Sequence, residues 1–272
     1  MSDVFAMSGN TPNYSGMLFN KGNTKTPFST MIGGKRKYTD HTEFVTGQEY
    51  ETATGSQPNI SEAASLTAPD ASVITREQKT NVTQIFQESV GISYGKMSNM
   101  GTLSGLNVAG QKANPISEED FQVAAKMAKI GQDIEYTFLN GTYQKSTGDT
   151  VANRSRGLLN AITSNIIDAN GKTLSFMLLC EALKSIKESN GDITNIVLGL
   201  DSTSRLQLNA DAVANGLTIV ESGRDINGIA VDKVLTPLGT VYLRDLFYLP
   251  VGTVALFDPF IMAPVEQLTP GK

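Results

Sequence analysis

The sequence is poor in the residue types on which most enzyme mechanisms depend. Its 272 residues include one histidine, His41, one cysteine, Cys180, and no tryptophan. A single cysteine forms no disulfide within the chain, and one cysteine with one histidine supplies too few ligands for a Cys/His zinc site. Any mechanism that activates a nucleophile with a histidine base would have to use His41. We therefore expect no catalytic residue, no cofactor-binding residue and no metal site.

Long apolar runs are also missing. No stretch approaches the ~20 consecutive apolar residues that a membrane span requires. Residues 1–20 have neither a basic start nor an apolar core of the kind found in secretory signals, so we expect the protein to stay in the cytoplasm where it is made. Apolar residues make up 40% of the chain, which excludes a wholly disordered protein and leaves room for a sizeable core.

The remaining candidates for chemistry have simpler explanations. No phosphate-binding loop and no dinucleotide-binding glycine motif occurs. Cys180 lies in a strongly apolar stretch, which favours a buried, inert thiol. Asp133 and Glu135 do not share a helical face, so they form no acid/base pair. The acidic run 118–120 is typical of a helix start, where negative charge complements the helix dipole.

Charge is distributed unevenly, although the net charge is only −5. Residues 1–38 carry five basic residues against Asp3, whereas residues 39–60 carry four acidic residues and no basic one. The two segments either pair with each other, within one chain or between copies, or remain a solvated tail. The cluster Lys35, Arg36 and Lys37 lacks interleaved aromatic residues and is a weak signal for nucleic acid, although it offers charge for non-specific contact with phosphates.

The first part of the chain reads as two extensions. Residues 1–40 form an expected arm, because their isolated apolar residues follow no helical or strand period. Such a segment does not offset its ordering entropy, roughly 1–2 kcal/mol per residue, unless a neighbouring subunit holds it. Residues 41–95 predict a long hairpin with strands at 42–54 and 81–94 and a polar tip at 55–71. Isolated two-stranded hairpins are marginal in water, so this one also needs a partner. The residues expected to contact neighbouring subunits are Lys35, Arg36, Lys37, Phe44, Tyr50, Val82 and Phe86.

A long helix is the clearest local signal. Ser117 is a suitable N-cap, and the pair Ile116 and Phe121 is spaced as a hydrophobic staple. Apolar residues recur at helical spacing as far as Asn140, where Gly141 follows as a stop. About 24 residues in helical conformation span about 36 Å. The apolar face consists of Val123, Met127, Ile130, Ile134 and Phe138.

The rest of the chain mixes helices and strands without strict alternation, which indicates an α+β fold. Residues 96–115 read as a loop. Helices are expected near 153–169, 173–189 and 202–214. Strands are expected at 195–199, 217–220, 228–235, 240–243 and 251–257.

Several short strings, in this order, resemble the major capsid proteins of tailed bacteriophages, which have the HK97-like fold, and in particular the SU10-like group. The strings are NVTQIF at 81–86 with VGIS at 90–93, FLNG at 138–141, VANRSRGLL at 151–159, LPVGTV at 249–254 and FDP at 257–259.

The resemblance implies names for the regions. Residues 1–40 would be the N-terminal arm, 41–95 the extended loop (E-loop), 96–149 a peripheral domain with the spine helix, 150–238 the axial domain and 239–272 the closing strands of the peripheral domain. The implied function is a structural subunit that assembles as hexamers and pentamers into the icosahedral shell around double-stranded DNA. Assembly in the host cytoplasm, without covalent cross-links, and separate scaffolding, portal and decoration proteins are expected with it.

Two alternatives stay open. An encapsulin, the shell protein of a bacterial cargo compartment, shares the fold. A soluble α+β enzyme without a recognisable site is the more distant alternative. Packaged genome, packaged protein cargo and a monomer in solution separate the three possibilities.

Overall fold

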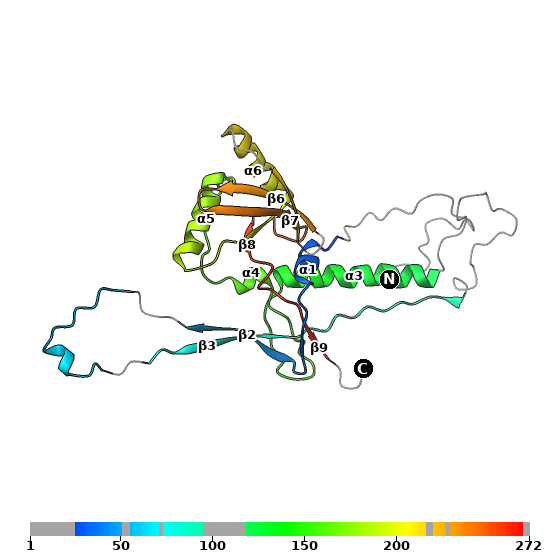
Figure 1. The fold of residues 1–272 in the computed structure, drawn as a ribbon. Helices are drawn as coiled ribbons and strands as arrows, with labels where there is room; N and C mark the ends of the chain where they lie inside the picture. Colours follow the sequence, from blue (N-terminus) through cyan, green and yellow to red (C-terminus); the bar gives the residue numbers. More distant parts are fainter. Residues whose placement is uncertain are drawn as a thin grey trace.

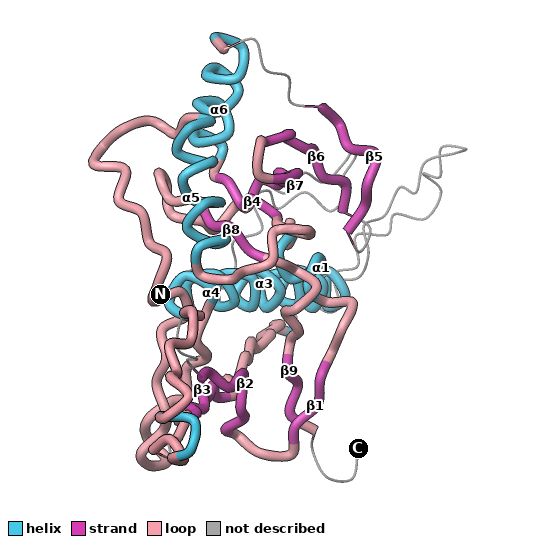
Figure 2. The backbone as a smooth tube through the Cα atoms, turned by 60° about the vertical axis from the view of Figure 1, so that its left-hand side comes forward, coloured by secondary structure: helices cyan, strands magenta, loops and turns pink. Residues whose placement is uncertain are grey.

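The structure is a computed structural model that describes residues 25–50, 55–70, 73–94, 118–215, 220–226 and 229–268. Helices and strands are mixed along the chain, which confirms the α+β prediction. A long helix crosses the middle of the molecule, with the largest sheet on one side and two separate strand pairs on the other (Figures 1 and 2). One of these pairs belongs to a hairpin that projects away from the rest of the chain (Figure 1).

The largest sheet has five strands in the order β5-β6-β7-β4-β8. β4 runs parallel to β7, and the other neighbours are antiparallel. All residues of β4 are buried, as expected for a strand that is covered on both faces. The strands are β4 (Val197–Leu200), β5 (Val220–Ile226), β6 (Ile229–Thr236), β7 (Gly239–Asp245) and β8 (Ala255–Phe257).

Two helices, α5 (Phe176–Glu188) and α6 (Ser202–Ala214), cover one face of this sheet (Figure 2). Each begins after a residue whose side chain accepts hydrogen bonds from the first turn, Ser175 for α5 and Asp201 for α6. Burial raises the pKa of Asp201, but hydrogen bonds to its carboxylate outweigh burial and leave the pKa below its ordinary value. The apolar core between helices and sheet comprises Leu174, Leu179, Leu183, Ile196, Leu198, Leu200, Leu208, Val234, Val241 and Leu243.

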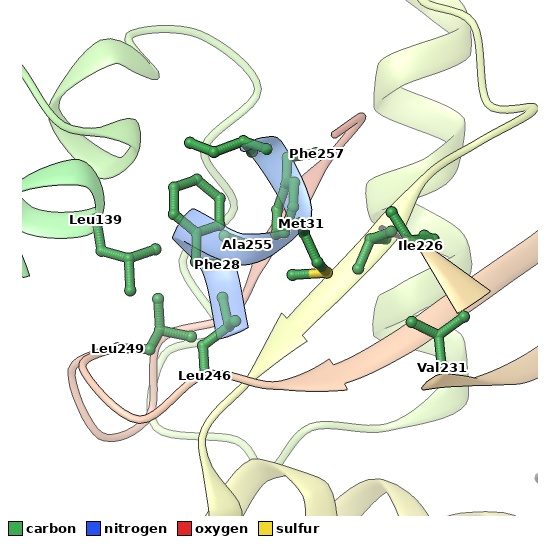
Figure 3. Close-up of a cluster of buried hydrophobic side chains, with 11 residues drawn as sticks. Phe28, Met31, Leu139, Ile226, Val231, Leu246, Leu249, Ala255 and Phe257 are labelled. Atoms are coloured by element: carbon green, nitrogen blue, oxygen red, sulfur yellow. The ribbon is translucent and has the colours of Figure 1, made fainter. Parts of the chain in front are cut away.

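The opposite face of the sheet packs against α1 (Pro27–Ile32) and the C-terminal end of the long helix α3 (Glu118–Asn140) (Figure 3). The ring of Phe28 meets that of Phe257 edge to face, with centroids 5.2 Å apart. Met31 lies beside Ile226 of β5 and is fully buried (Figure 3). This second core therefore joins the start of the described chain to its last strands.

The expected arm at residues 1–40 is therefore partly wrong. Residues 27–32 do not depend on a neighbour, because Phe28, Met31 and Ile32 share one helical face and are buried in their own chain. Residues 1–24 lie outside the described part of the chain, and the arm prediction stays open for them.

A carboxylate from α3 holds α1 in place. Glu135 is 0% exposed. Its Oε1 accepts a hydrogen bond from the backbone N of Phe28 at 2.8 Å, and its Oε2 accepts one from the backbone N of Ser29 at 2.7 Å and another from the Ser29 hydroxyl. Amides in the first turn of a helix have no partner within the helix. Glu135 thus supplies the cap that Thr26, the residue before α1, does not provide.

The second strand pair on the far side of α3 joins β1 (Lys37–Thr39) and β9 (Val265–Gln267) in parallel. The backbone N of Lys37 donates to the carbonyl of Pro264 at 3.0 Å, and the backbone N of Leu268 donates to the carbonyl of Thr39 at 2.9 Å. Strands from opposite ends of the described chain are therefore neighbours.

The end of α3 is tightly packed against a later segment through two glycines. The backbone N of Gly157 donates to the carbonyl of Gly141 at 2.8 Å. A Cβ at Gly157 would lie 2.5 Å from the backbone N of Gly141, a distance that real Cβ atoms essentially never show. The glycines therefore allow residues 153–157 to pass directly beside the end of α3.

Most of the other predicted elements are confirmed, two strands are displaced and one helix is wrong. The strand predicted at 217–220 is β5, which begins at Val220, and the strand predicted at 81–94 is β3, which covers Arg76–Val82. The helix predicted at 153–169 is reduced to α4 (Leu158–Ala161). Its next residue, Ile162, has an extended backbone, and Asn165 has a φ of 57°, so a helix does not continue there. Ser117 and residues 96–115 lie outside the described residues.

Candidate assembly interface

The projecting hairpin consists of β2 (Glu43–Tyr50) and β3 (Arg76–Val82), which pair antiparallel with a bulge between Val45 and Gly47. A short 3-10 helix, η1 (Ala64–Leu66), lies near its tip. Every described residue from 45 to 79 is exposed. The outer part of the hairpin therefore has no core of its own.

The exposed hairpin nevertheless carries large apolar side chains. Tyr50 is 66% exposed, Leu66 88% and Val73 87%. Exposed apolar side chains on a structure this thin gain no burial from their own chain, so they are suited to contact with another one. The remaining members of this set are Val45, Ile60 and Ile74.

The returning strand lies earlier than expected. We predicted it at 81–94, whereas β3 ends at Val82. Its residues 76–80 (REQKT) show no apolar alternation, because neither face of the outer hairpin is buried in the chain. The alternation on which the prediction rested belongs to residues that follow the strand.

The base of the hairpin is fixed by side-chain hydrogen bonds to two other segments of the chain. The carboxamide of Asn81 accepts a hydrogen bond from the backbone N of Arg156 at 2.8 Å and donates one to its carbonyl at 3.1 Å. The Ser155 hydroxyl donates to the carbonyl of Val82, and Thr83 donates to the Gln267 side chain at 2.7 Å. The base of the hairpin is therefore held by its own subunit, whereas the exposed outer part extends away from it.

Acidic residues of the hairpin pair within the chain, but with partners other than the basic cluster. Glu43 contacts Lys145 at 2.5 Å, and Glu49 contacts Lys79 at 3.3 Å. The hydrogen bond from Lys145 lowers the pKa of Glu43 below its ordinary value. Asp40 pairs with His41 at 2.7 Å, and both side chains are exposed. For these residues the internal pairing of segments 1–38 and 39–60 is not found.

The predicted contact residues are not gathered into one patch. The Lys35 ammonium donates to the carbonyl of Phe260 at 2.9 Å and lies over its ring, so it binds its own chain. Val82 is 1% exposed and offers no surface to a neighbour, which contradicts its assignment as an inter-subunit contact. Arg36, Lys37 and Tyr50 are exposed, whereas Phe44 and Phe86 are half-buried.

Residues 83–94 run beside the N-terminal half of α3 (Figure 1). The Glu88 carboxylate meets the ammonium groups of Lys126 at 2.8 Å and Lys129 at 3.4 Å. The hydrogen bond from Lys126 lowers the pKa of Glu88 despite an opposing effect of desolvation. The backbone of 84–92 forms no hydrogen bond to another described residue. Among the described residues these polar groups have no backbone partner, as on the open edge of a sheet.

The same half of α3 exposes several of the apolar side chains that its sequence pattern places on the apolar face or in the staple of the helix. Val123 is 47% exposed and Met127 64%, and Phe121 is also exposed. Leu139, at the other end, is fully buried. Helical periodicity identifies the apolar face but does not indicate where the sheet ends and the helix projects beyond it.

The described residues hold no constellation for catalysis. No group of three or more His, Cys, Asp or Glu residues among them is placed to bind a metal ion. Cys180 is half-buried, and burial raises the pKa of its thiol, which works against reactivity. Asp133 pairs with Lys129 while Glu135 caps α1, so the two carboxylates act separately, as predicted. None of the described helices combines the length and apolar character needed to cross a membrane.

Comparison with known proteins gives the family. The family model for the SU10 major capsid protein matches residues 2–270. No curated protein matches the chain. Because the match covers nearly the whole sequence, the chain belongs to the SU10 major capsid protein family. Its role is that of a structural capsid protein of a phage virion rather than of an enzyme.

Proposed function

We propose that this member of the SU10 major capsid protein family is the repeating subunit of an icosahedral shell, built from hexamers and pentamers, that encloses the double-stranded DNA of a tailed bacteriophage. The observation that carries the proposal is the hairpin, whose outer part is exposed throughout and whose base is bonded firmly to the subunit. A closed shell gains its stability from many modest contacts of this kind, each repeated by symmetry.

In this proposal the fold is HK97-like. The hairpin is the E-loop, α3 is the spine helix of the peripheral domain, and residues 150–238 form the axial domain. The E-loop of one copy lies across a neighbour and buries apolar side chains such as Tyr50 and Leu66 against it. The backbone of 84–92, which forms no hydrogen bond to another described residue, lies beside the exposed apolar half of α3, and together they provide a matching surface on the neighbour.

Contact with packaged DNA is proposed to be non-specific. Arg36 and Lys37 are exposed, and a net charge of −5 limits adhesion of the rest of the subunit to phosphate. Assembly in the host cytoplasm and cooperation with separate scaffolding, portal and decoration proteins complete the proposal.

Assembly is tested with a paired replacement at the hairpin tip, Ile60→Ser with Leu66→Ser. Both side chains are exposed in the subunit. The unfolding midpoint of the unassembled chain should therefore stay unchanged, whereas the yield of shells in negative-stain images should fall severalfold. The matched control replaces polar neighbours in the same tip, Gln57→Ser with Thr67→Ser, and should assemble like the parent.

A parent protein that stays monodisperse in light scattering, at the mass of one chain, contradicts the shell proposal. Shells that enclose protein cargo instead of nucleic acid favour the encapsulin alternative.

A further inference from the structure

Three Asn-Gly dipeptides lie wholly within the described residues, at Asn140, Asn170 and Asn190. An asparagine followed by glycine is the dipeptide most prone to internal attack, because glycine has no side chain to hinder its own backbone nitrogen. The attack requires that this nitrogen be free and that the asparagine side chain be able to turn toward it. The three sites differ in both respects.

At Asn170 both requirements are met. Asn170 and Gly171 are exposed, with φ values of 50° and 75°, and they form the centre of a turn that the backbone N of Lys172 closes on the carbonyl of Ala169 at 2.9 Å. The backbone N of Gly171 donates to none of the described residues. The side-chain nitrogen of Asn170 makes one long contact, 3.3 Å to the carbonyl of Asp168. A Cβ placed on Gly171 would meet nothing within 4 Å, so the surroundings are open.

The other two sites are restrained. The backbone N of Gly191 donates to the carbonyl of Ile186 at 2.9 Å. The backbone N of Gly141 donates to the carbonyl of Thr137 at 2.8 Å, and the Asn140 side chain donates to the carbonyl of Tyr248 at 2.7 Å. Attack at either site must first break the bond that holds the glycine nitrogen, and at Asn140 the bond that holds the carboxamide as well.

We propose that Asn170 is a site of spontaneous deamidation in the folded protein. The backbone nitrogen of Gly171 forms a bond to Cγ of Asn170 and loses its proton to solvent. The Cγ–Nδ2 bond breaks, the side-chain nitrogen takes up a proton from solvent and leaves as ammonia, and the new N–Cγ bond completes a succinimide ring. Water then opens the ring at one of its two carbonyls and yields aspartate or isoaspartate, with no oxidant or reductant required. Each reacted copy carries one additional negative charge on the exposed turn between α4 and α5.

Peptide mapping after incubation of the full chain in mildly alkaline buffer tests the proposal. Trypsin separates the two comparable sites, because Lys172 ends the peptide 157–172 and Lys187 precedes the peptide 188–205. Asn190 is the matched control, since it has the same following residue, is also exposed and has a φ of 59°. The bond from Gly191 to Ile186 alone should make deamidation at Asn190 roughly two- to tenfold slower than at Asn170.

Two further measurements decide the outcome. In urea, where the fold no longer distinguishes the sites, both asparagines should react at similar rates. In Asn170→Gln the longer side chain disfavours ring closure, so the mass gain in peptide 157–172 should disappear. Equal rates at Asn170 and Asn190 in the folded chain, or a gain that persists in Asn170→Gln, overturn the proposal.

Discussion

A carboxylate enclosed by protein has to be matched by donors, and Glu135 is matched by two backbone amides and one hydroxyl of α1. The arrangement fastens a helix too short to be stable alone to a long one. It also places Phe28 against Phe257 and thereby organises the core on that face of the sheet.

Glu135→Ala should lower the free energy of unfolding by at least about 2 kcal/mol, because each buried donor left without an acceptor costs roughly 1–3 kcal/mol. Urea unfolding of the unassembled chain, followed by circular dichroism, measures the loss. Asp133→Ala is the control on the same helix: its half-exposed ion pair with Lys129 is worth ~0–1 kcal/mol. Equal losses in the two variants would contradict the role assigned to Glu135.

At the scale of elements, ion pairs connect the segment 83–94 to α3. Glu88 lies between Lys126 and Lys129, and its pKa is depressed below the ordinary 4.5. A depressed pKa in the folded chain means that the ion pairs contribute stability above pH 4.5, and that the contribution is lost as the pH falls through the lowered pKa.

The titration of Glu88, followed by NMR of its side-chain carboxyl, should therefore give a pKa below 4.5. Lys126→Met should move this pKa back toward 4.5, because it removes the largest cause of the shift. Lys184→Met, on α5, breaks an exposed pair with Glu188 and should leave the Glu88 titration unchanged. A Glu88 pKa that is insensitive to Lys126→Met would show that the pair does not form.

Elements with strong local signals could be predicted from the sequence, and those defined by distant contacts could not. The helix predicted near 202–214 is confirmed as α6, and the structure shows that Asp201 caps its first turn. The bounds of β3 differ from the prediction because both faces of the outer hairpin are solvated, which removes the apolar alternation that marks a strand. The capping of α1 by Glu135 could not be predicted from the sequence either, because Glu135 follows Phe28 by more than a hundred residues. Among the residues predicted to contact a neighbouring subunit, Val82 is instead buried in its own chain. Apolar character alone does not distinguish a core residue from an interface residue.

The whole subunit depends on its first described residues more than their polar composition suggests. Deletion of residues 1–24 leaves the contacts of α1 with the other described residues in place, so the truncated chain should unfold at a urea concentration close to that of the parent. Deletion of residues 1–38 also removes Phe28 and Met31 from the core. Truncation of a large buried side chain costs about 2–5 kcal/mol, and two such losses approach the 5–15 kcal/mol that stabilises a typical domain.

The longer deletion should therefore yield little folded protein, as judged by circular dichroism and solubility. The shorter deletion separates folding from assembly: a folded chain that forms few shells supports a role for residues 1–24 in contact with neighbours. A stably folded chain that lacks residues 1–38 would refute the structural role of α1.

The pairing of β1 with β9 also has a consequence for how the protein is made. Residues 27–39 are translated well before their partners, Phe257 and residues 264–268, which follow more than two hundred positions later in the chain. The edge of β1 and the part of the apolar face of α1 that packs on Phe257 therefore stay uncovered while these more than two hundred residues are translated. Contacts between residues this far apart in sequence also form slowly. The core is therefore completed only after residues 257–268 have been translated, so a nascent chain displays its hairpin before it has a finished subunit to support it.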